Sequence, residues 1–451
     1  MKKFLKKGKK IGFAAVLCLL AAACGALLLA GCESAKEESK DPAGEPSDTP
    51  SGQAGTDPTF DPAALQFLSG SAPVGAPKDG KIGEDFRKGY AKLAMQLLTK
   101  CRGKTDGQLM VSPLSVLTAL AMTANGAGGE TLAEMEQMLT GLPLEQLNEQ
   151  LALFVNSLPS EENAKFSSAN ALFVNPLYQV KDHFLNTVQG LYRAEIAKTD
   201  FGNPALAAKN INDWCKEKTD GMIDKVVKEN DFDLQTLMVL VNALCFDAKW
   251  ESPYLEESQI ADGVFHAADG EKTLTFLRET AYYEDYLSSR AATGFVKLYE
   301  GGKYGFMALL PKKDLDTLLS ELTPEAWLEL WNTKQKTQIS TAIPKFKTGT
   351  DVELKEVLAA MGMQKAFSGE AEFTNMIEGV PVNVGKVIHK TFLELDNEGT
   401  RAAAVTAVEM RCTASPVQPK QVILDRPFLY AIVDMNTGLP IFFGTFEGVT
   451  E

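Results

Sequence analysis

The run of small residues that follows residue 399 restricts the fold more than any other feature of the chain. Residues 387–396 are rich in β-branched and aromatic side chains, which is typical of a strand. Only Asn397, Glu398 and Gly399 separate this segment from the run 400–414, which contains no proline and no further glycine. The sequence therefore places two extended segments next to each other with a very short connection.

The side chains of this run divide by strand parity into two different faces. The even positions are Thr400, Ala402, Ala404, Thr406, Val408 and Met410, and the odd positions are Arg401, Ala403, Val405, Ala407, Glu409 and Arg411. Every charge lies at an odd position, which indicates a strand with one buried and one exposed face. The pattern fits a permanent hairpin strand after a turn at Glu398-Gly399, and it also fits a segment that enters a sheet only under some condition.

The N-terminus has the pattern of a targeting segment. Six lysines precede an apolar run, 11–30, and small residues stand directly before Cys32. This order resembles the bacterial lipobox, which implies cleavage before Cys32 and a lipid on its thiol. A transmembrane anchor is the alternative, because an apolar run of that length spans a bilayer. Both interpretations place the rest of the chain outside the cytoplasm.

We divide the chain into a signal peptide over 1–31, a disordered tether over 32–80 and one folded domain over 81–451. The tether is rich in Ser, Pro, Gly, Asp and Glu and has too little apolar surface to form a core. Helical spacing dominates the first third of the domain, where Thr131 with Glu134 predicts a helix start. Strand-like runs dominate later, so the order predicts an α+β fold, not alternating β-α-β units.

Composition and motifs exclude several function classes. The net charge of −14 argues against nucleic acid or anionic lipid as a partner. We find no zinc-type cluster and no glycine-rich phosphate loop, so we predict no metal and no cofactor. The histidines are His183, His266 and His389, and no nucleophile elbow accompanies them. We therefore predict no catalytic residue and no enzyme.

Eight motifs follow one another across more than 300 residues: Ser112-Pro113-Leu114-Ser115, Asn125-Gly126-Ala127-Gly128-Gly129-Glu130-Thr131, Asn170-Ala171-Leu172-Phe173, Ile211-Asn212-Asp213-Trp214 with Thr219-Asp220-Gly221-Met222-Ile223, Val241-Asn242-Ala243-Leu244-Cys245-Phe246 through Trp250, Ile343-Pro344-Lys345-Phe346, Val387-Ile388-His389-Lys390 and Arg426-Pro427-Phe428. In this order, and together with the run after Gly399, they resemble the serpin family. The run itself is similar to the serpin reactive-centre loop, whose hinge reads roughly Gly-Thr-Glu-Ala-Ala-Ala-Ala-Thr.

The resemblance implies the serpin fold, which has three β-sheets, a helical layer and an exposed reactive-centre loop. It implies that Ser112, Ser115, Asn242 and His389 form a hydrogen-bonded "shutter" beneath the central sheet. Trp250 would lie near the "breach" where the loop enters that sheet. The alternative for each residue is an ordinary buried polar group without a gating role.

The resemblance also implies a mechanism in which the loop is bait. A protease cuts it and forms an acyl-enzyme, and the freed segment inserts as a new strand before water releases the acyl group. The hinge residues would be Gly399, Thr400, Arg401, Ala402, Ala403, Ala404, Val405 and Thr406. Small inward side chains suit a segment that enters a closing sheet, and the absence of proline keeps its ladder hydrogen bonds available.

The chain departs from the family pattern at several positions. Asn397 and Arg401 stand where glutamate is usual, and Val405 replaces a usual small residue. Asp247-Ala248 replaces the usual Lys-Gly. Arg401 and Val405 lie on the outward face, so neither should block insertion. These departures leave the speed of insertion open, and slow insertion makes a substrate and not an inhibitor.

Family spacing from Gly399 places the scissile bond between Thr413 and Ala414. Cleavage after Cys412 or Ala414 is the near alternative, whereas Met410 and Arg411 lie further off. Threonine or alanine at the cleaved position suits elastase- or subtilisin-like proteases, and Arg411 as bait would suit trypsin-like ones.

The sequence therefore predicts a monomeric, extracytoplasmic inhibitor of extracellular serine proteases, held in the bacterial cell envelope by the lipid on Cys32 or secreted. It predicts no nucleic-acid partner and no other membrane contact. The alternatives are a serpin-fold surface lipoprotein that binds a partner or ligand, and an unrelated surface adhesin.

Overall fold

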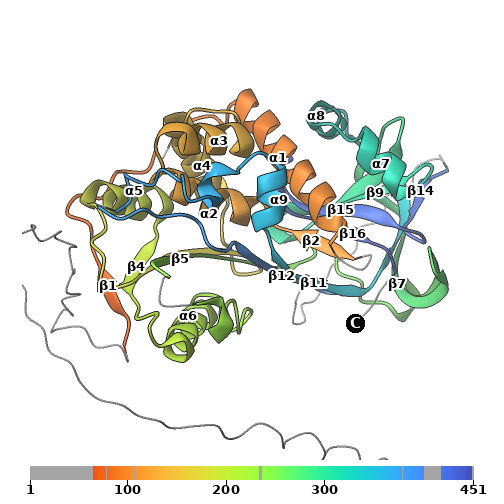
Figure 1. The fold of residues 1–451 in the computed structure, drawn as a ribbon. Coiled ribbons are helices and arrows are strands. Elements are labelled where there is room, and N and C mark those ends of the chain that lie inside the picture. The colour runs from red at the N-terminus through yellow and green to blue at the C-terminus, as the bar shows by residue number, and fades with distance from the viewer. Residues whose placement is uncertain are drawn as a thin grey trace, which may run out of the picture. The chain divides into compact units, whose positions relative to one another are not determined.

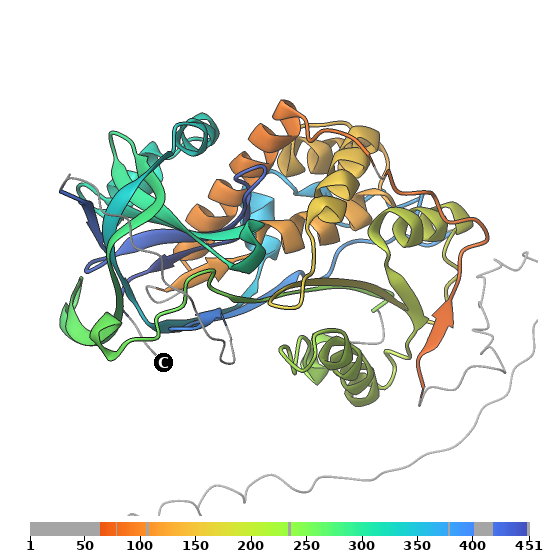
Figure 2. The same ribbon diagram turned by 180° about the vertical axis from the view of Figure 1, so that it is seen from behind.

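The computed structural model describes residues 64–77, 79–104, 108–232, 236–377, 379–400 and 418–448. Within these ranges the chain forms nine α-helices and sixteen strands (Figures 1 and 2). The helices are α1 (Glu84–Arg102), α2 (Pro113–Ala124), α3 (Gly129–Leu139), α4 (Leu144–Ser157), α5 (Asp182–Tyr192), α6 (Pro204–Lys218), α7 (Leu315–Glu321), α8 (Pro324–Asn332) and α9 (Lys355–Ala360). The strands are β1 (Gln66–Leu68), β2 (Leu109–Val111), β3 (Ala164–Val174), β4 (Glu195–Lys198), β5 (Met238–Lys249), β6 (Ile260–Ala267), β7 (Gly270–Ser288), β8 (Ala292–Leu298), β9 (Tyr304–Pro311), β10 (Gln335–Pro344), β11 (Phe346–Glu353), β12 (Ile388–Leu395), β13 (Gly399–Thr400), β14 (Lys420–Ile423), β15 (Phe428–Asp434) and β16 (Pro440–Phe446).

The strands pair into two connected sheets. The first has the order β1-β4-β3-β5-β13-β12-β11, and the second has the order β14-β10-β7-β8-β9-β15-β16-β2, with β6 added on β7. The expected second and third sheets are continuous through β7. Its residues 270–277 pair with β6, its residues 276–286 pair with β10, and its residues 285–288 pair with β8. The α+β class is confirmed.

The helices cover the seven-stranded sheet unequally. Figure 1 shows α2, α4 and α5 on one side of β5 and β4, with α6 on the other side. Helix α2 is buried along nearly its whole length, as its run of alanine and leucine predicts. It begins at Ser112, whose Oγ accepts a hydrogen bond from Ser115 N, and it ends at Asn125.

Helix α3 begins earlier than Thr131, so that prediction is wrong. Gly128 precedes the first turn and provides no side-chain cap. Thr131 is fully buried inside the helix, and its Oγ1 accepts a hydrogen bond from Glu372 N. Glu134 accepts from Gln364 N and Lys365 N instead of closing a capping box. Both side chains bind a distant loop, which local sequence does not reveal.

Part of the segment assigned to the tether contacts the folded unit. Strand β1 pairs antiparallel with β4, from Gln66 opposite Lys198 to Leu68 opposite Ile196. Further along, Val74 N donates to Asn186 O at 3.0 Å. The apolar residues Phe67 and Leu68 give this short stretch a strand pattern that the polar composition around it conceals.

Cysteines and apolar helices add little to this picture. Cys101, Cys215 and Cys245 are buried, and Cys412 lies outside the described residues. Among the described helices, none combines the length and the apolar character that crossing a bilayer requires. The predicted signal peptide and lipidation site at Cys32 lie in the part of the chain that the structure does not describe.

Candidate functional site

The first two residues of the predicted hinge already belong to the seven-stranded sheet. Strand β13 pairs with β5, where Gly399 lies opposite Lys249 and Thr400 opposite Ala248. On its other side Thr400 lies opposite Leu395 of β12. The turn before it is held by Asp396, whose Oδ1 accepts from Glu398 N and Gly399 N at 2.8 and 3.1 Å. The chain therefore turns at 396–399 and enters between two existing strands.

Close approach of the backbone explains why glycine occupies position 399. A Cβ atom there would lie 2.1 Å from the carbonyl oxygen of Ala248 and 2.6 Å from Lys249 Cα. Backbone atoms of a paired strand have no freedom to move away, so any larger residue would push β13 off β5.

Below β13 the two flanking strands face a slot. Strand β5 pairs with β3 on one side and β12 pairs with β11 on one side, while within the described residues β5 and β12 form no ladder with each other. A small cavity of about 20 Å³ lies there, lined by residues of both strands and by Met222 and Ile223. Two strand edges that face each other are a template for one more strand.

An aromatic stack holds the entry of this slot. The Trp250 ring is stacked on Tyr299 at 4.5 Å between centroids, and Tyr299 Oη forms a 2.7 Å hydrogen bond with Thr400 Oγ1. Trp250 Nε1 donates to Asp396 O at 2.9 Å, and its backbone N donates to Glu398 O at 2.8 Å. The side chains of Trp250, Tyr299 and Thr400 are all buried. Trp250 thus lies directly beside the segment that enters between β5 and β12.

A buried charge cluster lies behind the stack. Lys297 Nζ forms a 2.7 Å ion pair with Glu279 Oε1, and the ammonium lies over the rings of Trp250 and Tyr254 at 5.7 and 4.6 Å. Glu284 is also buried, and burial raises its pKa to about 8, an effect that neighbouring Glu279 increases and Lys297 opposes. Buried charges are costly unless paired, so removing either Lys297 or Glu279 alone would leave an uncompensated buried charge.

Three of the four predicted shutter residues lie in one hydrogen-bonded group. Ser112 N donates to His389 Nε2 at 3.0 Å, and Ser112 Oγ donates to Ile441 O at 2.9 Å. Ser115 N donates to Ser112 Oγ at 3.2 Å. His389 is buried, and burial lowers its pKa to about 4, so the ring is neutral and its Nε2 is an acceptor at neutral pH. This group joins α2 to β12 and β16.

The fourth residue, Asn242, is bonded elsewhere. Its Nδ2 donates to Asn170 Oδ1 at 2.6 Å, and Asn170 donates to Tyr192 O at 2.8 Å. Within the described part of the chain, the Asn242 side-chain oxygen is buried without a hydrogen-bond partner. An unsatisfied buried acceptor is unfavourable by about 1–3 kcal/mol, so β5 carries an unsatisfied polar group at Asn242.

The remaining predicted site residues lie outside the described residues. These are Arg401, Ala402, Ala403, Ala404, Val405 and Thr406 of the hinge, and Thr413 and Ala414 of the reactive site. The described chain resumes at Gln418, and β14 then pairs in parallel with β10. The segment that carries the predicted scissile bond therefore runs between β13 in one sheet and β14 in the other.

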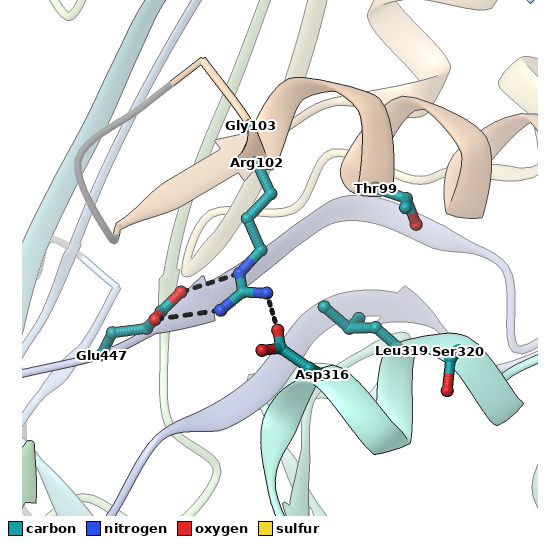
Figure 3. Close-up of a pocket in the computed structure, with 7 residues that line it drawn as sticks. All are labelled: Thr99, Arg102, Gly103, Asp316, Leu319, Ser320 and Glu447. Atoms are coloured by element: carbon teal, nitrogen blue, oxygen red, sulfur yellow. Dashed lines mark hydrogen bonds and ion pairs between the residues drawn. The ribbon is translucent and has the colours of Figure 1, made fainter. Parts of the chain in front are cut away.

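Outside this site, a surface pocket of about 440 Å³ lies at the end of α1 (Figure 3). Arg102 occupies it and forms hydrogen bonds to both carboxylate oxygens of Glu447, at 3.0 and 3.1 Å, and an ion pair with Asp316. The guanidinium thus joins α1 to α7 and to the residue that follows β16. In the described ranges no group of three or more His, Cys, Asp or Glu side chains is placed to bind a metal ion.

Sequence reasoning missed Tyr299 and the Lys297 cluster. Tyr299 is the direct partner of the hinge residue Thr400, but nothing in the linear sequence joins positions 101 residues apart. Lys297 did leave a signal, because a lysine within the strand run Gly294-Phe295-Val296-Lys297-Leu298 is unusual unless it is paired.

Comparison with known proteins agrees with this geometry. The family model "Serpin (serine protease inhibitor)" matches residues 88–448. The chain is similar to an uncharacterised serpin-like protein of Thermococcus kodakarensis, with 32% identity over 75% of this chain and 80% of that protein. It is similar to serine proteinase inhibitor A3K of Cavia porcellus, with 30% identity over 74% and 82%.

Solved structures give the same result. The thermophilic serpin Tengpin in its native state has a TM-score of 0.76 and 33% identity, and covers 85% of this chain and 100% of its own. The same protein in its latent state has a TM-score of 0.71 over 82% of this chain and 100% of its own. The fold is the serpin fold, and the family contains protease inhibitors, not enzymes. The chain with its slotted sheet and hinge belongs to the serpin family.

Proposed function

We propose that this serpin is an irreversible suicide inhibitor of extracellular serine proteases. After cleavage of its loop, the hinge would continue from β13 into the slot between β5 and β12 and trap the acyl-enzyme. The observation that carries this proposal is that Thr400 already pairs with both β5 and β12, and Gly399 with β5, at one end of two strands that form no ladder with each other within the described residues.

Side-chain size supports insertion. Thr400 is 1% exposed beneath Tyr299, so the inward row accepts only small residues there. The next inward positions in the sequence are Ala402, Ala404 and Thr406, all small. Each residue that enters gains ladder hydrogen bonds, with a net contribution of about 1 kcal/mol per bond, and completes the unpaired edges of two strands.

The target class follows from the reactive site proposed from family spacing. Cleavage between Thr413 and Ala414 would select proteases with a small apolar specificity pocket, of elastase or subtilisin type. Cleavage after Arg411 would select trypsin-like enzymes instead. We further propose a bacterial, lipid-anchored or secreted location outside the cytoplasm, on the lipobox resemblance at Cys32.

The decisive experiment separates trapping from simple cleavage. The purified protein is incubated with an elastase-type and a trypsin-type serine protease, and a denaturing gel is combined with mass spectrometry of the released peptide. We expect a covalent band at the summed mass and release of residues 414–451. Complete cleavage with the protease still active would instead support a non-inhibitory serpin-fold protein that binds a partner.

A variant at the hinge provides the matched control. Thr400→Arg places a long charged side chain under Tyr299, so we expect cleavage to continue while the covalent band disappears. Thr400→Ser keeps the hydroxyl that bonds Tyr299 and should trap like the wild type. Equal trapping by Thr400→Arg would contradict insertion at this site.

A further inference from the structure

A lysine is buried in β8 beside the entry of the slot. Lys297 is 1% exposed, and its ammonium forms the 2.7 Å ion pair with Glu279 Oε1. Lysine is rarely buried, because its ammonium carries three N–H donors that all need partners. What the ammonium contacts besides Glu279 therefore indicates why a lysine stands at this place.

Three aromatic rings surround the same ammonium. Their centroids lie 4.6, 5.7 and 6.0 Å from Lys297 Nζ, for Tyr254, Trp250 and Tyr282 in this order. A cation is attracted to the negative face of an aromatic ring, and more strongly where water is excluded. In the described part of the chain Tyr254 forms no ring–ring pair, so the ammonium joins its ring to that of Trp250.

All three rings belong to or contact the short segment 250–254 that follows β5. Trp250 and Tyr254 are the two ends of this segment. Tyr282, which comes from β7, forms a 2.6 Å hydrogen bond through its Oη with Ser252 Oγ in the middle of the segment. The lysine therefore contacts the side chains that determine where the whole segment lies.

The same segment holds the turn that precedes the hinge. Trp250 Nε1 donates to Asp396 O at 2.9 Å, and its backbone N donates to Glu398 O at 2.8 Å. Tyr254 N donates to Asn397 O at 2.8 Å. Three successive carbonyl groups of the turn thus accept hydrogen bonds from one segment, and the position of that segment sets the position of the turn.

An ion pair suits the task of orienting these side chains. A buried ion pair adds little to stability, because desolvation offsets the attraction, but its geometry can specify one arrangement. A methionine would fill the same space and pack against the rings without a preferred direction. Burial raises the pKa of Glu284, the other buried acid, to about 8, so it is mostly protonated at pH 6.5. At that pH, Lys297 is therefore matched by the single charge of Glu279.

We propose that Lys297 is a positioning residue. Its ammonium, paired with Glu279, orients the three rings and so fixes the segment 250–254 against the turn that brings Thr400 into the sheet. This positioning exists before any protease binds. Its effect on trapping rests on the proposed function, because a displaced turn would remove the pairs from which the cleaved loop is proposed to insert.

The test separates the position of the segment from the stability of the protein. The purified full-length protein is studied by hydrogen exchange with mass spectrometry at pH 6.5, and its unfolding temperature is measured in parallel. Lys297→Met with Glu279→Leu replaces the pair by apolar side chains, so we expect an unfolding temperature within about 3 °C of wild type. We expect the amides of Trp250 and Tyr254 to exchange about fivefold faster, as for the loss of one hydrogen bond, and peptides from β15 to stay unchanged.

Two further variants are the controls. Lys297→Arg keeps a cation that can pair with the carboxylate and lie over the rings, so it should retain the exchange rates of wild type. Arg102→Met with Glu447→Leu also replaces a charged pair by an apolar one, but it joins other elements and should leave the exchange of 250–254 unaltered.

Trapping is measured on the same proteins with an elastase-type protease. The variant at Lys297 and Glu279 should consume about fivefold more inhibitor per protease trapped, whereas the variant at Arg102 and Glu447 should match wild type. If wild type traps no protease, the proposed function fails, and hydrogen exchange still decides the positioning role. If wild type traps and the variant at Lys297 and Glu279 traps equally well, the effect on trapping is overturned.

The exchange data have outcomes that would overturn the positioning role itself. Unchanged exchange of 250–254 in the folded variant at Lys297 and Glu279 would show that the ammonium does not hold the segment. Faster exchange of all peptides together with a lower unfolding temperature would show a general loss of stability instead. Fast exchange of 250–254 in folded Lys297→Arg would show that a cation at this place is not what orients the rings.

Discussion

At the scale of single residues, two buried ionisable groups beside the slot give opposite pH dependences. Burial lowers the pKa of His389 to about 4, so the folded chain keeps it neutral where the unfolded chain, with a pKa near 6.5, takes up a proton. Its contribution to stability is complete above about pH 6.5 and is lost as the pH falls toward 4. Burial raises the pKa of Glu284 to about 8, so its contribution is complete below about pH 4.5 and is lost as the pH rises toward 8.

Substitution of either residue should remove its part of the pH dependence of stability. His389→Gln keeps an acceptor for Ser112 N and should flatten the fall in stability below pH 6.5. Glu284→Gln should flatten the fall in stability between pH 4.5 and 8. For each residue, the free energy of unfolding changes by at most about 1.4 kcal/mol per pH unit. Urea unfolding across pH 4–8 measures both. Parallel profiles for all three proteins would show that neither group titrates as its burial requires.

Arg102 provides a second residue-scale prediction. Arg102→Met leaves Glu447, whose side chain is 15% exposed, without its paired donor, so we expect a loss of about 1–3 kcal/mol in the free energy of unfolding. Asp316→Asn changes an exposed partner of the same arginine and should cost less than about 0.5 kcal/mol. Chemical denaturation of the two variants checks the difference, and equal losses would contradict it.

At the scale of elements, the entry of β13 depends on the contact between Gly399 and β5. Gly399→Ala places a Cβ 2.1 Å from Ala248 O, so we expect β13 to separate from β5 and trapping of a protease to fall at least tenfold. Gly385→Ala is the control, because no atom lies within 4 Å of the Cβ position there. The measurement is inhibitor consumed per protease trapped. Normal trapping by Gly399→Ala would show that the observed pairing is not required.

The helices and strands differ in how well the sequence predicts them. The start and end of α2 follow from local signals, since Ser112, Pro113 and Asn125 act on neighbouring backbone. The start of α3 and the strand β1 do not, because Thr131 and Glu134 bind a loop more than 200 residues away and β1 exists only through β4. The same division applies to the site. Motif order indicated Trp250 and three members of the hydrogen-bonded group, Ser112, Ser115 and His389, but Tyr299 required the contacts of the folded chain.

At the scale of the whole molecule, the edge strand of the seven-stranded sheet is β1, which precedes all the described helices in the chain. Strand β1 covers the edge of β4, and Ala72 N and Val74 N donate to Asn186 Oδ1 and O. A chain that starts at residue 64 should match the full protein in stability. A chain that starts at residue 80 loses these bonds and should unfold about 2–3 kcal/mol more easily, with self-association through the open edge. Urea unfolding and size-exclusion chromatography test this, and equal behaviour of the two chains would contradict it.

The pairing of only two residues in β13 also has a kinetic consequence. Forming the first pairs of a new strand is slow, because closing the loop costs conformational entropy before any hydrogen bond forms to offset it. Here the first pairs exist, so in the proposed insertion the strand would grow in one direction from a formed nucleus beside Trp250. Residues along the loop would then act in a fixed order of time. A substitution near Thr400 would delay the start of insertion relative to deacylation, whereas one further along would stop a strand that is already growing.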